Sequence, residues 1–245
     1  MKPVTAFLIA GLLLSTPLRA AELSVAVAAN FTAPMQKIAA AFEKETGHRL
    51  ALSFGSTGKF YAQIRNGAPF EVLFAADQET PARLEQEGLG VAGTRFTYAT
   101  GRLVLWSKQP GLVDDQGEVL RTGAFERLAL ADPRLAPYGA AAMQTLKQLG
   151  LADALAGRFV QGESIGQAYQ FVATGNAPLG FVALSQVYAD GRLTEGSAWM
   201  VPETLYAPIR QDALILAKGR DNAAAADFMR YLQGGAAKAV IRSHG

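Results

Sequence analysis

The chain contains no cysteine. This absence excludes disulfide bonds, thiolate metal sites and cysteine nucleophiles. Histidine is nearly absent as well, since His48 and His244 are the only two. Neither has a partner at the spacing of known metal-ligand motifs, so we expect both to be solvated side chains and expect no metal cation to be held by direct protein ligands.

The chain also lacks an excess of charge of either sign. It has 23 Lys and Arg against 21 Asp and Glu. Lys2 and Arg19 lie in the N-terminal segment described below, and without them the two totals are equal. No run rich in Lys or Arg is present, so the sequence gives no support to a nucleic-acid partner.

Long apolar runs are missing except at the N-terminus. Met1 and Lys2 are followed by an apolar stretch from Ala6 to Leu14, and then by small residues up to Ala21. The stretch is too short to span a bilayer. The pattern predicts a cleavable signal peptide over residues 1–21 and a protein exported to the periplasm.

The rest of the chain alternates between short β-rich runs and amphipathic helical patterns. An alternating run over residues 22–28 precedes a helical stripe that contains Met35, Ile38 and Phe42. The order β-α-β-α-β-α over the first 87 residues predicts a parallel sheet with helices on both faces. The same order recurs after residue 128. We expect a last helix over residues 222–232.

Two long β-rich runs, near residues 98–106 and 205–213, could each cross between two units. They suggest two Rossmann-like α/β lobes with a cleft between them: residues 22–101 plus 208–245, and residues 102–207. One large α/β domain is an equally good interpretation of this pattern by itself.

The segment Ser53-Phe54-Gly55-Ser56-Thr57-Gly58-Lys59 stands out between a β-rich run and a helical pattern. Gly55 and Gly58 allow close approach of the backbone to a ligand. Ser56 and Thr57 place hydroxyl groups at a helix N-terminus, where unpaired N–H groups attract anions. A plain helix cap explains the same residues. A nucleotide P-loop does not, because Ser53 and Phe60 stand where that pattern requires a glycine and a hydroxyl residue.

Three further turns have the same position at the start of a predicted helix. They contain Asn30, Tyr138 and Ile165. Asn30 is well placed to cap its helix, and its side-chain amide could also donate to an anion. Ligands of open α/β sheets bind beyond the carboxyl ends of the strands. Two facing lobes would therefore direct four helix N-termini into one cleft and form an uncharged site for a small oxyanion.

These motifs, in their order and spacing, resemble the periplasmic molybdate-binding proteins of ABC importers, which have the type II periplasmic binding-protein fold. The resemblance covers essentially the whole mature chain. It is carried by five segments: Ala28-Ala29-Asn30-Phe31-Thr32, Gly55-Ser56-Thr57-Gly58, Asn66-Gly67-Ala68-Pro69, Ala136-Pro137-Tyr138-Gly139 and Ala177-Pro178-Leu179-Gly180-Phe181-Val182.

The resemblance implies a receptor for molybdate or tungstate, held by hydrogen bonds alone, with no cofactor and no enzymatic activity. Asn30, Ser56 and Thr57 would donate from the first lobe, and the main-chain N–H groups of Tyr138 and Ile165 from the second. The sequence differs from many of these relatives at two places, and both affect which groups can donate hydrogen bonds to the anion. Ala29 stands where many relatives have a hydroxyl residue, and Ala183-Leu184 stand where some have a tyrosine.

The implied receptor is a monomer that delivers the anion to a membrane ABC permease. Three alternatives stay open at this point. They are a receptor for sulfate or another tetrahedral oxyanion, a secreted hydrolase that uses Ser56 as its nucleophile, and a surface adhesion module without a small ligand. Lys59 is expected to be solvated.

Overall fold

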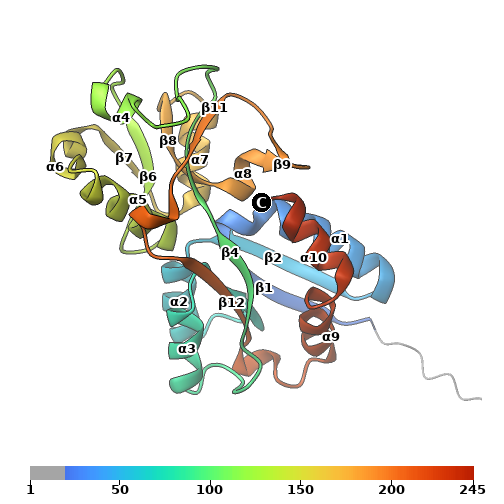
Figure 1. The fold of residues 1–245 in the computed structure, drawn as a ribbon. Helices are drawn as coiled ribbons and strands as arrows, with labels where there is room; N and C mark the ends of the chain where they lie inside the picture. Colours follow the sequence, from blue (N-terminus) through green and yellow to red (C-terminus); the bar gives the residue numbers. More distant parts are fainter. Residues whose placement is uncertain (1–19) are drawn as a thin grey trace, which may run out of the picture.

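The computed structural model describes residues 20–245 and shows two α/β lobes. Residues 1–19 of the predicted signal peptide lie outside this range. In Figure 1 the lobes lie one above the other, and the antiparallel strands β4 and β12 both extend between the lower lobe and its junction with the upper one. The predicted two-lobed α/β fold is therefore confirmed.

The first lobe is built on a five-stranded sheet with the order β2-β1-β3-β12-β4. Strands β1, β2 and β3 are parallel, as the β-α-β order predicts, and β12 is antiparallel to both β3 and β4. The inner strand β1 is almost entirely buried because helices cover both faces of the sheet. The strands are β1 (Glu22–Ala28), β2 (Arg49–Gly55), β3 (Val72–Phe74), β4 (Phe96–Gly101) and β12 (Ile209–Ile215).

The second lobe has a sheet with the order β11-β5-β8-β6-β7. Strand β6 is parallel to β7 and β8, whereas β5 is antiparallel to β8 and β11. A two-stranded hairpin lies beside it. The strands are β5 (Leu103–Ser107), β6 (Leu128–Ala131), β7 (Phe159–Gly162), β8 (Leu179–Ala183), β11 (Ser197–Met200), and in the hairpin β9 (Tyr188–Ala189) and β10 (Arg192–Leu193).

The helices follow the strands and bury one apolar face each. Helix α1 ends at Gly47, whose φ of 76° suits glycine. The α-helices are α1 (Thr32–Thr46), α2 (Thr57–Arg65), α3 (Glu79–Gln86), α4 (Val119–Thr122), α5 (Pro137–Gln148), α6 (Ala152–Leu155), α7 (Ile165–Ala173), α8 (Leu184–Val187), α9 (Ala223–Leu232) and α10 (Gly235–Ser243). The short 3-10 helices are η1 (Ala29–Phe31), η2 (Ala156–Arg158), η3 (Glu203–Leu205) and η4 (Ala217–Gly219).

The run over residues 98–106 crosses between the lobes as expected, as two strands in two sheets with an interruption at Arg102. Two local predictions were wrong. Helix α10 follows the helix that was expected to be the last. Asn30 caps no helix, because it lies inside η1 and Phe31 occupies the N-cap position of α1. The lobe boundaries at residues 101/102 and 207/208 stay a prediction, since strand membership does not show where the chain bends.

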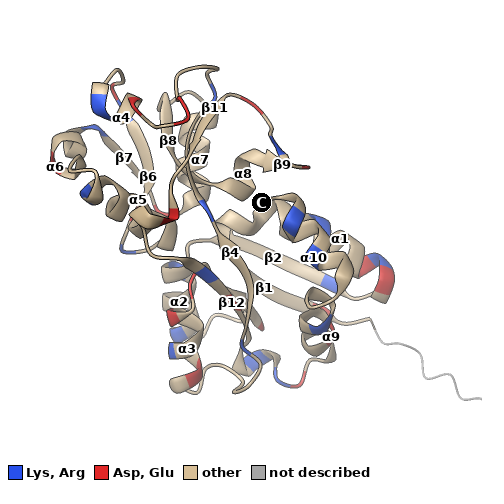
Figure 2. Ribbon diagram, viewed as in Figure 1, with Lys and Arg blue, Asp and Glu red and all other residues tan. Residues whose placement is uncertain are grey.

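Charged residues of both signs are spread over the outer helices and loops (Figure 2). Helix α2 carries basic residues only, whereas α3 carries residues of both signs. Among residues 20–245, no helix is both long and apolar enough to cross a membrane.

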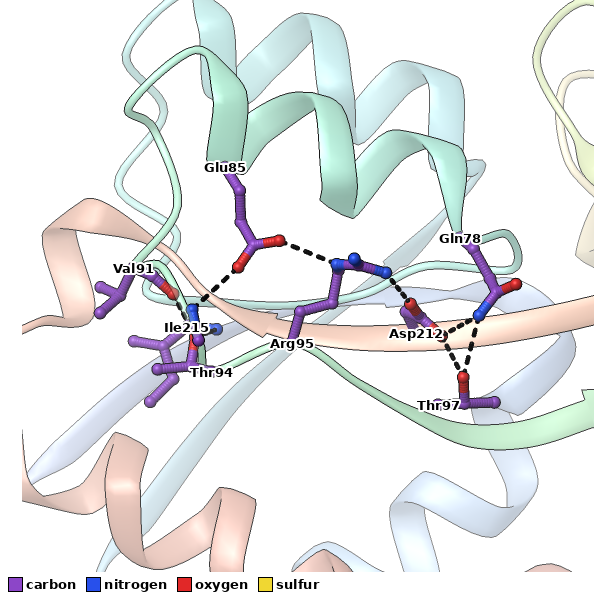
Figure 3. A network of polar contacts seen from close by, with 9 residues as sticks. Gln78, Glu85, Val91, Thr94, Arg95, Thr97, Asp212 and Ile215 are labelled. Carbon is purple, nitrogen blue, oxygen red and sulfur yellow. Dashed lines mark hydrogen bonds and ion pairs between the residues drawn. The ribbon is translucent and has the colours of Figure 1, made fainter.

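A buried carboxylate ties β12 to its neighbours in the first lobe (Figure 3). Asp212 is 1% exposed. Its Oδ2 lies 2.7 Å from Arg95 Nη1, and its Oδ1 accepts hydrogen bonds from Thr97 Oγ1 at 2.6 Å and from Gln78 Nε2 at 3.1 Å. Arg95 also pairs with Glu85 at 2.8 Å. A buried carboxylate is tolerated only when its oxygens have such partners.

Replacing Asp212 by Asn should therefore destabilise the protein. We expect Asp212→Asn to lower the free energy of unfolding by about 1.5–3 kcal/mol, the usual value of a hydrogen bond to a charged group. Urea denaturation measures it. Glu203→Gln, at an exposed pair with Arg102, is the matched control and should change stability by less than about 0.5 kcal/mol. Equal effects of the two substitutions would contradict a special role for Asp212.

Candidate functional site

The four predicted turns meet where the lobes face each other. Each follows the carboxyl end of a strand: η1 follows β1, α2 follows β2, α5 follows β6 and α7 follows β7. Helix α7 and helix α8 of the second lobe pack against η1 of the first. The five predicted site residues are all buried, with exposed fractions of 2–3%; they are Asn30, Ser56, Thr57, Tyr138 and Ile165.

Direct contacts join the lobes around these turns. Gly58 N donates to Leu135 O at 2.9 Å, and Ser185 Oγ donates to Asn30 O at 2.6 Å. A side chain on Gly166 would place its Cβ only 3.1 Å from the Cβ of Ala29. The small size of Gly166 and of Ala29 therefore lets α7 approach η1 closely, and a larger residue at position 29 would press on the second lobe.

An ion pair also spans the two lobes. Lys59, at the start of α2, pairs with Glu163, which precedes α7. Lys59 was expected to be solvated, and both side chains are indeed about half exposed, but the ammonium group has a carboxylate partner. The hydrogen bond from Lys59 holds the pKa of Glu163 below its usual value.

The hydroxyl groups of the second turn have structural partners. Ser56 is the N-cap of α2, and its Oγ accepts from Lys59 N at 3.4 Å. Thr57 Oγ1 accepts from Ala76 N at 2.9 Å, in a buried position. Both oxygens act as acceptors in these contacts. A hydroxyl group carries one proton in addition, which each can still donate to a ligand.

The second lobe contributes main-chain donors. Tyr138 and Ile165 lie in the first turns of α5 and α7, where N–H groups have no partner within the helix. No hydrogen bond is recorded for either N–H group within residues 20–245. Pro137 precedes Tyr138 and has no N–H, so Tyr138 supplies the first donor of α5. Both groups are available to an oxyanion.

Asn30 has an unusual environment for a buried amide. Its Nδ2 donates to Gln211 Oε1 at 2.7 Å. Its Oδ1 is a buried side-chain atom without a hydrogen-bond partner, the one such atom among the residues that the structure describes. Leaving a buried acceptor unpaired costs about 1–3 kcal/mol. The amide is therefore held in place on one side and unsatisfied on the other.

Two residues that sequence reasoning missed, Gln211 and Tyr98, lie beside the Asn30 amide. Gln211 in β12 is hydrogen-bonded to the Tyr98 hydroxyl at 3.1 Å, and its Nε2 and the Tyr138 hydroxyl both border the position that a Cβ on Gly101 would take. Burial raises the pKa of both tyrosines, so both stay protonated. Gly101 leaves room for this group, because a Cβ there would lie 2.0 Å from the Tyr138 hydroxyl oxygen. The only signal in the sequence was the glycine within a β-rich run.

A cavity of about 550 Å³ lies beside these groups, lined by both lobes and by the chain leading into β12. Gly58, Asp77, Leu135, Gln144 and Arg210 are among its lining residues, and burial raises the pKa of Asp77. None of the five predicted site residues lines this cavity among the described part of the chain. Asn30 and Tyr138 line a separate cavity of about 20 Å³ together with Gln211.

The prediction that both histidines are solvated was wrong. His48 is 4% exposed and lies 3.2 Å from Ala21 N, and His244 is 3% exposed with Nδ1 2.8 Å from Val240 O. His48 therefore packs inside the first lobe, and His244 packs at the C-terminal end of α10. Within residues 20–245, no group of three or more His, Asp or Glu could hold a metal ion.

The structure also shows whether a serine has the neighbours that a catalytic nucleophile requires. Gly162-Glu163-Ser164-Ile165-Gly166 fits the Gly-x-Ser-x-Gly pattern of a nucleophile elbow. Ser164, however, is the N-cap of α7, and its Oγ accepts from Gln167 N at 3.3 Å. In the described residues neither histidine is hydrogen-bonded to Ser164 or Ser56, so neither serine has an imidazole base beside it.

The fold and the buried, uncharged donors define a two-lobed solute-binding protein. A model of the family "Bacterial extracellular solute-binding protein" matches residues 23–245. The chain belongs to this family.

Individual relatives are closely similar. "Molybdate-binding protein ModA" of Azotobacter vinelandii is 63% identical over 233 residues, which cover 95% of this chain and 92% of the relative. The protein of the same name from Rhodobacter capsulatus is 50% identical over 232 residues, with coverage of 95% and 90%. The solved Azotobacter vinelandii periplasmic molybdate-binding protein superposes with a TM-score of 0.88 at 45% identity, covering 91% of this chain and 97% of that one. The resemblance stated from the sequence is confirmed.

The close fit at Gly101 yields a direct test. We expect Gly101→Ala to displace the Tyr138 hydroxyl and Gln211, and to lower the free energy of unfolding by about 1–3 kcal/mol, as overpacking of a core does. Thermal or urea denaturation measures this. Gly157→Ala is the control, because a Cβ on Gly157 meets nothing within 4 Å. If the two variants unfold alike, the packing argument at Gly101 is wrong.

Proposed function

We propose that this chain is an extracytoplasmic receptor that binds molybdate, and tungstate as its close analogue, between the two lobes. The observation that carries the proposal is the 63% identity, over 95% of the chain, to a protein named for molybdate binding. The donors at the lobe interface support it, because they suit a fully ionised oxyanion.

The chemistry of the site favours recognition by hydrogen bonds without a cation. A fully ionised tetrahedral oxyanion accepts hydrogen bonds and donates none. Hydrogen bonds to a charged acceptor are about twice as strong as those between neutral groups, and a buried setting strengthens them further. Lys59 is paired with Glu163, which leaves the anion to hydroxyl, amide and main-chain donors.

The proposed ligand contacts are the five residues predicted from the sequence. Ser56 and Thr57 would donate hydroxyl protons, Asn30 a side-chain N–H, and Tyr138 and Ile165 main-chain N–H groups. Ala29 and Ala183 offer no side-chain donor, which limits how many bonds the anion can receive. Discrimination against sulfate would then depend on the size of the closed site, because the two anions share charge and shape.

The wider role follows the family. The chain would act without catalysis and without a cofactor, as a periplasmic monomer exported by the signal peptide at residues 1–21. Residues 22–101 with 208–245, and residues 102–207, would move as two lobes by a hinge at the crossovers. The loaded receptor would then deliver the anion to a membrane ABC permease.

Calorimetric titration of the mature protein with molybdate, tungstate, sulfate and phosphate tests the function. We expect tight binding of the first two anions and no heat from the others. Ligand at one hundred times its dissociation constant should also stabilise the protein by about 2.7 kcal/mol. Tight sulfate binding would instead indicate a receptor for a smaller oxyanion. No heat from any of the four would overturn the receptor proposal.

Thr57 needs a more careful test than alanine substitution, because its Oγ1 also accepts from Ala76 N. We expect Thr57→Val to weaken molybdate binding by about 1–3 kcal/mol through loss of a donor to a charged oxygen, and also to destabilise the fold. Thr57→Ser keeps the hydroxyl group and is the matched control. Calorimetry gives the affinity and urea denaturation the stability. Unchanged affinity in Thr57→Val would remove this hydroxyl from the site.

A further inference from the structure

Gln211 is the centre of a buried polar group that reaches from the Asn30 amide to both lobes. It is 2% exposed. Its Oε1 accepts from Asn30 Nδ2 at 2.7 Å and lies 3.1 Å from the Tyr98 hydroxyl, and its Nε2 and the Tyr138 hydroxyl both border the position of a Cβ on Gly101. Asn30 follows β1 of the first lobe, whereas Tyr138 lies in α5 of the second.

A β-bulge sets the position of this group. In the pairing of β12 with β4, Gln211 lies opposite Ala99 and Asp212 opposite Thr97, so Tyr98 is the extra residue. Bulges of this kind redirect side chains and often occur next to functional sites. Here the bulge places the Tyr98 hydroxyl 3.1 Å from both Gln211 Oε1 and Ala75 O. The Tyr98 hydroxyl has one proton and can donate to only one of these two acceptors.

Counting donors and acceptors distinguishes two arrangements of the amides. In the first, Asn30 Nδ2 donates to Gln211 Oε1 and Asn30 Oδ1 has no partner among the described residues. An amide oxygen and nitrogen have nearly the same shape, so rotating an amide by 180° exchanges its donor and acceptor at little steric cost. Rotation of both amides gives the second arrangement.

The second arrangement satisfies every group except one donor. Gln211 Nε2 then donates to Asn30 Oδ1 and to the Tyr98 hydroxyl, which in turn donates to Ala75 O. Gln211 Oε1 accepts from the Tyr138 hydroxyl. Asn30 Nδ2 is the remaining unpaired atom, and it takes the place of the unpaired Oδ1. An unpaired N–H is what an acceptor-only ligand requires, whereas the first arrangement would present the anion with an oxygen.

We propose that Gln211 is a positioning residue, which holds the Asn30 amide in the rotated arrangement so that Nδ2 donates to the bound oxyanion. Gln211 itself acts through Asn30 and does not touch the anion. The inference rests on the proposed function. It adds Gln211, from the crossover strand β12, to the residues that serve the proposed site. It also gives a role to both the N–H groups and the oxygen of the Gln211 amide.

A double-mutant cycle tests the coupling. Gln211→Met removes both polar atoms at similar length. We expect it to weaken molybdate binding about tenfold in the wild-type background, the size expected when a donor to a charged group is partly lost. In an Asn30→Ala background the same substitution should change affinity less than about twofold, the usual limit of additivity. An equal loss in both backgrounds would mean that Gln211 acts through the fold, and would overturn the inference.

Gln144→Met is the matched control. Gln144 Oε1 accepts from Ala207 N, just before β12, and is not bonded to Asn30. The control therefore loosens the same crossover without touching the amide. We expect its effect on affinity to be equal in the two backgrounds.

A spectroscopic measurement on the wild-type protein keeps the inference testable if Gln211→Met fails to fold. The side-chain amide signal of Asn30 in a ¹H–¹⁵N spectrum is identified by its loss in Asn30→Ala. We expect molybdate to shift its proton downfield, as a new hydrogen bond to an anion does. Binding without such a shift would refute the positioning role. If calorimetry detects no oxyanion binding to the wild-type protein, it is the proposed function that fails.

Discussion

The structure depends on one constraint: polar groups are buried between two lobes without enough protein partners. The main-chain N–H groups of Tyr138 and Ile165 lie in the first turns of α5 and α7 and have no hydrogen-bond partner among the described residues. Burying such donors is costly unless something accepts their protons. The proposed anion, which only accepts hydrogen bonds, would relieve this cost and join the lobes. The unpaired atom of the Asn30 amide is the acceptor Oδ1, so an anion would relieve that cost only in the rotated arrangement that presents Nδ2. Gly166 and Ala29 let α7 come close to η1.

Three cationic side chains in this part of the molecule are paired with carboxylates. Lys59 pairs with Glu163, Arg134 with Asp132 and Arg95 with Asp212. The five proposed ligand contacts are uncharged donors, so the proposed site consists of oriented dipoles. Coulomb attraction between full charges does not distinguish one dianion from another, whereas a fixed set of short hydrogen bonds depends on where each oxygen lies. A site of this kind therefore selects by size and geometry, which matches the requirement for separating tetrahedral oxyanions of equal charge.

The sequence predicted those parts of the fold that local patterns determine. The parallel strands β1 to β3, the helix α1 and the four turns follow from periodicity, glycine positions and small polar residues within a few positions of one another. The Gln211 group could not be predicted in this way, because Gln211 lies 181 residues from Asn30 and 113 from Tyr98. His48 was misjudged for the same reason, since it pairs with the distant Asp227 and lies against Ala21. The turns that hold the five proposed ligand contacts were found from local residue patterns, and the resemblance assigned their roles. The structure adds that all five residues are buried.

Strand β12 connects the body of the first lobe to the proposed site through two successive residues. Asp212 is bonded to Arg95, Thr97 and Gln78 on one face, while Gln211 on the other reaches Asn30 and Tyr98. All of these partners belong to the first lobe. The Tyr138 hydroxyl of the second lobe lies near the Gln211 amide, beside Gly101. Separation of the lobes would remove Tyr138 from this group and leave the bond between Gln211 and Asn30 intact. The amide that faces the anion thus keeps its support in the first lobe whether or not the second lobe is in contact.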